Sequence, residues 1–225
     1  MECPLCNRIN KDMLDHLVTE NCCRSDAKIL VLLVVPHNIC ITNREHSCDA
    51  SAMPLALRIY NMGLKRSNQV QFGLLSSNVS RTVCDNNRRN CRKTYLKKCF
   101  MAILDQCSKN NMKTIVLDIH SYSCDTQYKI SKSIMCDQYV YQLSDRWPPA
   151  DYVKQLSYVF TNYNIANKII MGKNNDIIDL ASEYPDVVTT LIEIREGFDE
   201  KIIANAVISW LASIVEDEKR SCNIF

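Results

Sequence analysis

Six short runs of almost continuous apolar and β-branched residues alternate with amphipathic segments along most of the chain. The strand-like runs lie at residues 28–36, 69–76, 113–120, 137–144, 167–172 and 187–194, and the helix-like patterns lie at 50–62, 91–109, 149–162, 175–183 and 199–217. Continuous apolar runs are typical of strands that are buried on both faces. Strands that alternate with helices indicate a mostly parallel sheet with helices on both sides. We therefore expect an α/β fold, with one main domain at residues 27–218.

Charge and cysteine usage narrow the class of protein. The chain has 27 basic and 25 acidic residues, so its net charge of +2 provides no global attraction for nucleic acid or an anionic membrane. It has 13 cysteines, which is an odd number, and no secretory signal precedes them. We expect a reducing cytoplasmic or nuclear compartment, in which most cysteines are buried thiols or metal ligands. The apolar run at 27–36 is too short to span a bilayer.

The N-terminal segment, residues 1–26, has the pattern of a zinc knuckle. The stretch CPLCNRINKDMLDHLVTENCC contains Cys3 and Cys6 in a CxxC motif, then His16 on a helix-like segment, then Cys22 or Cys23. Three cysteines and one histidine complete a tetrahedral zinc site. So short a segment buries too little apolar area to fold without a bound metal. The spacing resembles that of the ubiquitin-binding zinc fingers of DNA-repair proteins. This resemblance implies a ubiquitin-like or nucleic-acid partner, whereas an apolar helix with incidental thiols is the alternative.

Three residues suited to metal binding or proton transfer fall at predicted strand ends. His37 directly follows the first run, His120 ends the run KTIVLDIH, and Glu193 lies near the end of VVTTLIEI. The carboxyl ends of parallel strands meet at one edge of a sheet, and ligands bind there. Either histidine alone is more often a packing residue. Together with a nearby carboxylate they predict a single site.

Zinc chemistry accounts for this combination of residues. A catalytic zinc ion commonly binds two histidines and one glutamate, and leaves a fourth position for water, whose pKa falls to about 7. We expect His37, Glu45 and His120 to bind the zinc ion. Glu193 then takes the proton of the water and passes it to the leaving amine.

Two residues close to Glu45 leave the details of the site open. His46 is adjacent to Glu45 and competes with it as a ligand. Asp49 either orients a ligating histidine or caps the helix that is expected to start near residue 50.

Five short motifs resemble, in order and approximate spacing, those of the N-formylglutamate amidohydrolase-like family, a branch of the zinc-carboxypeptidase-like hydrolases. They are VVPHNICITNREHSCDASAMPLA, NVSRTVCDNNRRN, VLDIHS, GKNNDIIDLA and TLIEIREGF, within residues 28–212. The resemblance implies a phosphorylase/hydrolase-like three-layer α/β sandwich and zinc bound by His37, Glu45 and His120. It also implies that Glu193 is the general base and acid. The residues that it implies for anchoring a substrate carboxylate are Arg81, Asp85, Asn87 and Arg88.

The chemistry of these arginines and of Arg195 fits such a site. Guanidinium groups bind carboxylates in a bidentate manner, although a solvated basic loop is the alternative for the cluster at 81–88. Arg195 lies two residues beyond Glu193 and therefore on the same side of the strand. It either stabilises an oxyanion or pairs with Glu193 or Asp118.

The sequence thus predicts a zinc-dependent hydrolase that cleaves the amide bond of an N-acyl or N-formyl amino acid, with one catalytic and one structural zinc ion. A catalytically inactive binding protein on the same fold is the main alternative, and a deacylase that acts on a modified protein is a third. In the tail at 219–225, Cys222 fits a prenylation pattern that would bring the chain to a membrane. An ordinary tail is the alternative.

Overall fold

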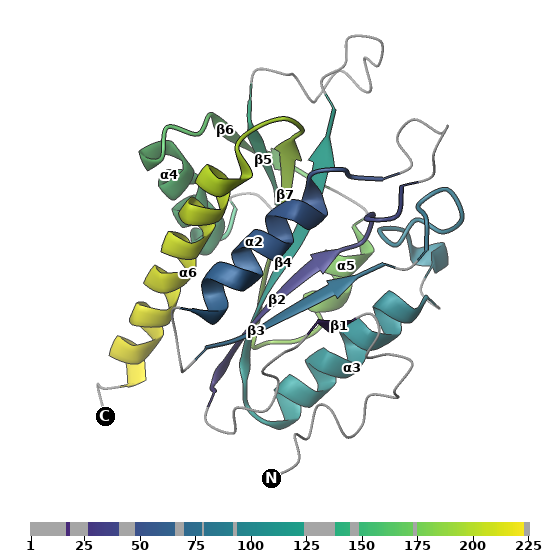
Figure 1. Cartoon of the computed structure of the whole chain (residues 1–225). Coiled ribbons are helices and arrows are strands. Elements are labelled where there is room, and N and C mark those ends of the chain that lie inside the picture. Colours follow the sequence, from purple (N-terminus) through teal and green to yellow (C-terminus); the bar gives the residue numbers. More distant parts are fainter. Residues whose placement is uncertain are drawn as a thin grey trace.

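The structure is a computed structural model that describes residues 17–18, 27–40, 48–65, 70–77, 79–91, 94–123, 138–144, 149–172 and 175–222. A sheet of seven described strands, in the order β1-β3-β2-β4-β7-β5-β6, forms its centre (Figure 1). The strands are β1 (Leu17–Val18), β2 (Ile29–Val35), β3 (Val70–Ser76), β4 (Lys113–Tyr122), β5 (Val140–Ser144), β6 (Asn167–Met171) and β7 (Val187–Arg195). The helices are α2 (Ala52–Leu64), α3 (Tyr95–Lys109), α4 (Asp151–Asn162), α5 (Asp176–Ala181) and α6 (Glu200–Cys222), and a 3-10 turn, η1, spans Arg89–Cys91.

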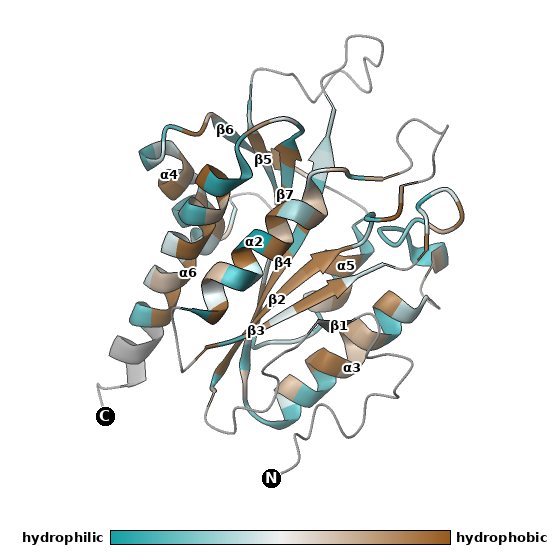
Figure 2. Ribbon diagram, viewed as in Figure 1, coloured by the Kyte–Doolittle hydropathy of each residue, from teal (hydrophilic) through white to brown (hydrophobic). Residues whose placement is uncertain are grey.

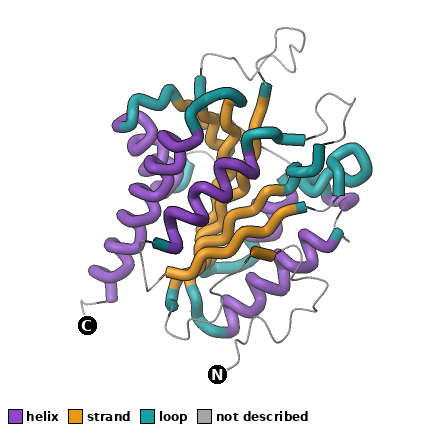
Figure 3. Tube along the Cα trace, in the orientation of Figure 1, coloured by secondary structure: helices purple, strands orange, loops and turns teal. Residues whose placement is uncertain are grey.

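Helices cover both faces of the sheet, as the alternating sequence pattern predicts. Helices α2, α4 and α6 pack on one face, and α3 with α5 packs on the other (Figures 1 and 3). Strand β2 shows why: Val31 and Leu33 face the α2 and α6 side, whereas Leu32 and Val34 face α3 and α5. The central strands β2 and β3 are accordingly coloured mostly as hydrophobic, whereas the helices alternate between hydrophobic and hydrophilic residues (Figure 2). The predicted α/β architecture is confirmed.

Parallel pairing carries four strand ends to one edge of the sheet. Strands β3, β2, β4 and β7 run parallel to their neighbours, so that Val35 ends β2 beside Ser76 of β3 and His120 of β4 lies beside Glu193 of β7. Strand β5 is antiparallel to β7, and β6 is parallel to β5. The candidate residues predicted at the ends of the first, third and last strands, which are His37, His120 and Glu193, belong to this edge.

The N-terminal segment differs from the prediction where it is described. A helix was expected over residues 11–18, but Leu17–Val18 forms β1, antiparallel to Leu74 and Leu75 of β3. The outer edge of β3 offers backbone groups for pairing, which favours an extended segment there over a helix. The predicted knuckle ligands lie outside the described residues, and the knuckle stays a prediction; they are Cys3, Cys6, His16 and Cys22.

The C-terminal helix is longer than predicted. Helix α6 continues to Cys222, so part of the expected tail is helical. The lipidation of Cys222 stays a prediction. Within the described residues, no helix combines the length and the apolar character that a membrane span requires.

Four cysteines form two disulfides, which the sequence analysis did not predict. Cys40 pairs with Cys48, and Cys84 pairs with Cys91. The two cysteines of each pair are only eight or seven positions apart, and an odd total of cysteines does not reveal such pairs. Cys99 and Cys107 in α3 are free and buried, as expected. The reducing compartment inferred from the cysteines stays a prediction.

Candidate active site

Two buried histidines and one buried aspartate meet at the carboxyl edge of the sheet. His37 follows β2, His120 lies near the end of β4, and Asp49 precedes α2. Asp49 Oδ2 lies 3.2 Å from His37 Nδ1 and 2.7 Å from His120 Nδ1. The centroids of the two imidazole rings are 5.0 Å apart. A single carboxylate oxygen thus bridges the Nδ1 atoms of both rings.

The other nitrogen of each imidazole contacts a further carboxylate. His37 Nε2 lies 2.9 Å from Asp85 Oδ1, and His120 Nε2 lies 3.1 Å from Asp118 Oδ1. A carboxylate beside Nε2 accepts a hydrogen bond from the protonated nitrogen there and fixes the orientation of the ring. Both Nδ1 atoms therefore face the same Asp49 oxygen.

The charges in this cluster influence one another strongly. Burial alone would raise the pKa of Asp49, but its hydrogen bonds with His120 and His37 hold the pKa well below its usual range. The pKa of Asp85 is likewise lowered, because its contact with His37 outweighs the effect of burial. Burial alone would lower the pKa of His120, but Asp118 and Asp49 raise it well above its usual value. Asp49 and Asp85 are therefore ionised near neutral pH, and Asp49 attracts positive charge to the point between the two rings.

Main-chain contacts hold the Asp49 segment against the ends of β4 and β7. The Asp49 N–H donates to the His37 carbonyl oxygen at 2.8 Å. The next two N–H groups donate to the Glu196 carboxylate and the Ser121 hydroxyl, each at 3.2 Å. The Ser121 hydroxyl in turn donates to Glu196 at 3.2 Å. The position of Asp49 is thus fixed by contacts with Ser121 near the end of β4 and with Glu196, which directly follows β7.

The structure also decides between the two interpretations of Asp49. Helix α2 begins at Ala52, and Ser51 is its N-cap residue. The Asp49 carboxylate does not cap this helix, because it contacts the two imidazoles instead. The interpretation as a helix cap is therefore wrong.

His37, Asp49 and His120 are suitable ligands for a zinc ion. One nitrogen of each imidazole and one Asp49 oxygen all lie within 4.8 Å of one another. Imidazole nitrogens and carboxylate oxygens bind zinc at about 2 Å, which places neighbouring ligand atoms roughly 3–4 Å apart. Ligating histidines usually donate their other N–H to a carboxylate, as Asp85 and Asp118 allow here. The donor set and its surroundings both fit the metal.

Glu193 lies beside this cluster on β7. It is the register partner of His120 in the β4–β7 pair, so both side chains point to the same face of the sheet. Burial raises the pKa of Glu193 to about 7, and the charges of Asp49 and Asp118 act in the same direction against those of His120 and Arg81. A carboxyl group with such a pKa both accepts and donates a proton near neutral pH.

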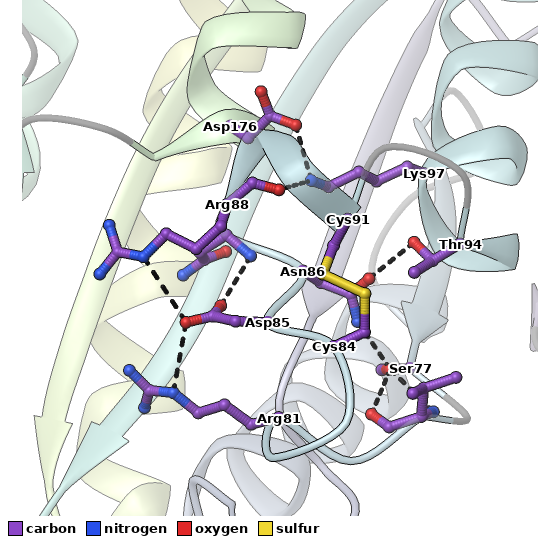
Figure 4. Close-up of a disulfide and its surroundings, with 12 residues drawn as sticks. Ser77, Arg81, Cys84, Asp85, Asn86, Arg88, Cys91, Thr94, Lys97 and Asp176 are labelled. Atoms are coloured by element: carbon purple, nitrogen blue, oxygen red, sulfur yellow. Dashed lines mark hydrogen bonds and ion pairs between the residues drawn. A yellow bond between two sulfur atoms is a disulfide. The ribbon is translucent and has the colours of Figure 1, made fainter.

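The loop at 79–91 contacts His37 through Asp85. Figure 4 shows the contacts that hold this loop. The Cys84–Cys91 disulfide closes it. Between these cysteines, the buried Asn86 side chain donates to the Ser77 hydroxyl at 2.8 Å and accepts from the Thr94 hydroxyl at 2.7 Å. The turn that carries Asp85 and its neighbours is therefore tied to the end of β3 and the start of α3.

The predicted substrate-binding residues come together on this loop. Arg81 Nε and Arg88 Nε each lie 3.6 Å from Asp85 Oδ2 (Figure 4). The side chains of Arg81 and Arg88 are 40% and 53% exposed. Asn87 Nδ2 lies 3.0 Å from His120 Nε2. The Asp85 carboxylate contacts His37 and both arginines. Because it would repel a substrate carboxylate, Asp85 is suited to hold His37 and the arginines in position and not to bind the substrate itself.

Arg195 lies at the end of β7, with its guanidinium over an aromatic ring. Its Cζ atom is 4.0 Å from the centroid of the Tyr139 ring, which stacks on Phe198 with 4.1 Å between centroids. Cation–π contact of this kind fixes the guanidinium. The predicted roles of Arg195 at an oxyanion, or in pairs with Glu193 or Asp118, stay predictions.

Two predicted residues lie outside the described part of the chain, and several contributors were missed. Glu45 and His46 belong to the first group. Asp118 was considered only as a partner of Arg195, although its spacing of two residues from His120 places both on one face of a strand. Other residues were missed because their role depends on long-range contacts that no local pattern reveals; they are Asn86, Ser121, Asn175 and Glu196.

Comparisons with known proteins give the fold. No protein-family model matches the sequence, and no curated protein matches it. A gene product from Agrobacterium tumefaciens has a similar structure, with a TM-score of 0.61 at 12% identity, covering 95% of this chain and 99% of that one. N-formylglutamate amidohydrolase from Ralstonia eutropha has a TM-score of 0.57 at 12% identity, covering 91% and 98% of the two chains.

A third solved structure has the same architecture. It is the catalytic domain of an N-acetylmuramoyl-L-alanine amidase from Bacillus (Paenibacillus) polymyxa, with a TM-score of 0.53 at 12% identity, covering 83% of this chain and 98% of that one. At these identities the similarity shows a shared fold. It extends over most of each chain.

Proposed function

We propose that the chain is a zinc-dependent hydrolase of an amide bond in an N-acyl or N-formyl amino acid, or in another amide that carries a nearby carboxylate. One observation supports this most directly. His37 and His120 direct their Nδ1 atoms at Asp49, and Glu193, with a pKa raised to about 7, lies beside them. The fold shared with an amidohydrolase and an amidase is consistent with this assignment.

In this proposal the zinc ligands are His37, Asp49 and His120. Asp49 takes the place that the sequence suggested for Glu45, because its carboxylate faces both imidazoles. Zinc bound there would supply a Lewis acid that polarises the amide carbonyl and lowers the pKa of water. Asp85 and Asp118 hold the two imidazoles in the orientation that ligation needs.

Glu193 performs the proton transfers of the hydrolysis. Its ionised form accepts a proton from the attacking water, and its protonated form then delivers that proton to the nitrogen of the leaving amine. The pKa of about 7 favours both steps, since neither form is strongly disfavoured near neutral pH. Arg195, predicted to stabilise the oxyanion, would contribute from the end of the same strand.

The substrate class follows from the arginines beside Asp85. Arg81 and Arg88 bring two partly exposed guanidinium groups to one side of the histidines. A carboxylate that accepts from them would hold the substrate with its amide toward His37 and His120. Asn87, on the same loop and in contact with His120, would contact the same carboxylate of the substrate.

The test of this function combines metal analysis with hydrolysis of N-formyl-L-glutamate and a panel of N-acetyl amino acids. With the predicted knuckle intact, we expect about two zinc ions per chain in the wild type and about one in a His37→Ala/His120→Ala variant. Glu193→Gln should keep the zinc of the wild type and lose hydrolysis by at least about 100-fold, because it keeps the shape of the side chain and removes the base.

The two variants separate the parts of the proposal. Full turnover by Glu193→Gln would exclude Glu193 as the base. An unchanged metal content in the double histidine variant would exclude the zinc site, whatever the activity of the wild type.

A further inference from the structure

A lysine and an aspartate form a fully buried ion pair beneath the loop that carries the arginines. Lys97 lies in the first turns of α3, and Asp176 is the first residue of α5. Lys97 Nζ lies 2.6 Å from Asp176 Oδ2, and both side chains are 0% exposed. None of the roles described above uses this pair.

The pair contacts the main chain of two successive loop residues. Lys97 Nζ also donates to the Arg88 carbonyl oxygen at 2.7 Å (Figure 4). The Asp176 N–H donates to the Asn87 carbonyl oxygen at 3.1 Å. The carbonyl oxygens of Asn87 and Arg88, the second and third residues after Asp85, are therefore held by the two members of one ion pair.

The residue next to Asp176 reaches the other half of the site. The Asn175 side chain donates to Asp118 Oδ2 at 2.9 Å, and its oxygen accepts from the Ile177 and Ile178 N–H groups at the start of α5. Asp118 in turn contacts His120. The start of α5 thus joins the loop at 87–88 to the carboxylate that orients a histidine.

Burial of two charges is costly, and hydrophobic residues of similar volume often stabilise a fold as well or better. Unlike hydrophobic residues, an ion pair makes directional hydrogen bonds. Lys97 donates to one carboxylate and one carbonyl oxygen, and this fixes the positions of both acceptors. Here that carbonyl belongs to Arg88, whose guanidinium lies at Asp85. The position of the Lys97–Asp176 pair therefore helps to set the position of the Arg88 side chain.

We propose that Lys97 and Asp176 are positioning residues that fix Arg88 and Asn87 for binding of the substrate carboxylate. This inference rests on the proposed function, since it concerns the same substrate. It predicts that loss of the pair weakens recognition of the carboxylate while leaving the zinc ligands and the proton-transfer residue in place.

The test compares the wild type with Lys97→Met/Asp176→Asn. The double variant is preferred to a single one, because removal of one partner would leave a buried charge unpaired and threaten folding. Lys98→Met is the matched control, since Lys98 is the neighbouring residue on α3 and is exposed. Each protein is assayed for zinc content, thermal unfolding, and hydrolysis of N-formyl-L-glutamate and its dicarboxamide, in which both carboxylates are replaced by amides and which is called the carboxamide below.

We expect the double variant to fold and to keep the zinc content of the wild type. Its KM for the carboxylate substrate should rise about tenfold with little change in kcat, because misplacement of a binding group acts on recognition first. Hydrolysis of the carboxamide should be unchanged within about twofold, because that compound lacks the charge that Arg88 recognises. Lys98→Met should match the wild type in every assay.

Other outcomes overturn the proposal in distinguishable ways. A folded, zinc-loaded double variant that keeps the wild-type ratio of carboxylate to carboxamide turnover makes the pair purely structural. If the double variant loses activity equally with both substrates, mainly in kcat, the pair serves the stability of the whole site. A double variant that does not fold leads to the same conclusion. A wild type that hydrolyses no member of the panel removes the proposed function, and this inference with it.

Discussion

Asp49 makes each histidine dependent on the other, because one of its oxygens serves both rings. Its position comes from N–H groups that are held by residues on β4 and β7, while its carboxylate faces the ends of β2 and β4. A substitution at Asp49 would therefore leave both imidazoles held at Nε2 by Asp85 and Asp118, but without a shared partner at Nδ1.

The raised pKa of Glu193 predicts a pH dependence of stability in the metal-free protein. In the folded state its pKa rises from 4.5 to about 7, so the folded state binds the proton more tightly than the unfolded state. This contribution is complete below about pH 4.5 and is lost as the pH rises through about 7. Glu193→Gln cannot titrate, so its stability relative to the wild type should increase between about pH 5 and pH 8, by up to about 3 kcal/mol.

Denaturant unfolding of both proteins in chelator, at several pH values, measures this difference. Parallel stability profiles across the range would contradict the assignment of a raised pKa to Glu193.

Arg88 and Arg89 are adjacent but have different surroundings. Arg88 lies at Asp85 in the candidate site, whereas Arg89 pairs with Asp179 on the surface and is 75% exposed. If Arg88 binds the substrate carboxylate, Arg88→Ala should raise KM by about 10- to 100-fold, as expected for loss of a charge-assisted bond of about 1.5–3 kcal/mol. Arg89→Ala should change KM less than about twofold, since exposed ion pairs contribute little. Similar effects of both substitutions on KM would argue against the clamp.

At the scale of elements, close packing of α2 on β3 allows no side chain at Gly63. A Cβ atom added there would overlap the ring of Phe72. Gly63→Ala should therefore destabilise the fold by about 1–3 kcal/mol through overpacking, although alanine alone favours a helix over glycine by about 1 kcal/mol.

Asn61→Ala on the same helix is the control, because Asn61 is exposed and only the helix propensity changes. Chemical unfolding of the two variants gives the comparison. A Gly63→Ala protein as stable as Asn61→Ala would mean that the ring of Phe72 moves aside at little cost.

The elements of the main domain were predictable because their signals are local. The apolar runs for β2 and β4 appear directly in the sequence, and with them His37 and His120 at the strand ends. The assignment of Leu17–Val18 to a helix failed because the pattern there is short, and the free edge of β3 determined its structure. The Cys84–Cys91 disulfide and the contacts of Asn86 depend on how a loop turns, which residue spacing alone does not specify.

The candidate site followed from the sequence only in part, for the same reason. Strand ends of a parallel sheet converge by rule, so the two histidines and Glu193 were predictable as neighbours. Asp49 lies in a connection between β2 and α2, where many paths satisfy the same length, and only the assembled fold places its carboxylate at the imidazoles.

For the molecule as a whole, a bound zinc ion should contribute to global stability. Ligands that bind only the folded state stabilise it by about 4 kcal/mol at a concentration 1,000 times Kd. For a protein of this size, removal of the ion by a chelator should lower Tm by roughly 8–16 °C. Differential scanning fluorimetry, with zinc added back, measures the shift.

The His37→Ala/His120→Ala variant separates this site from the predicted knuckle. Any shift that remains in that variant belongs to metal bound elsewhere, and only the difference from the wild type reports on the site. An equally large shift in both proteins would contradict zinc binding at His37 and His120.

Strand β4 carries three successive parts of the site on one short stretch of chain. Asp118 and His120 project from one face, and Ser121, on the other, accepts from the segment that holds Asp49. A slip of one residue against β7 would turn every one of these side chains to the opposite face. A single inserted or deleted codon within β4 should therefore take apart the proposed site even in a molecule that still folds, because the residues that now meet would no longer share a face.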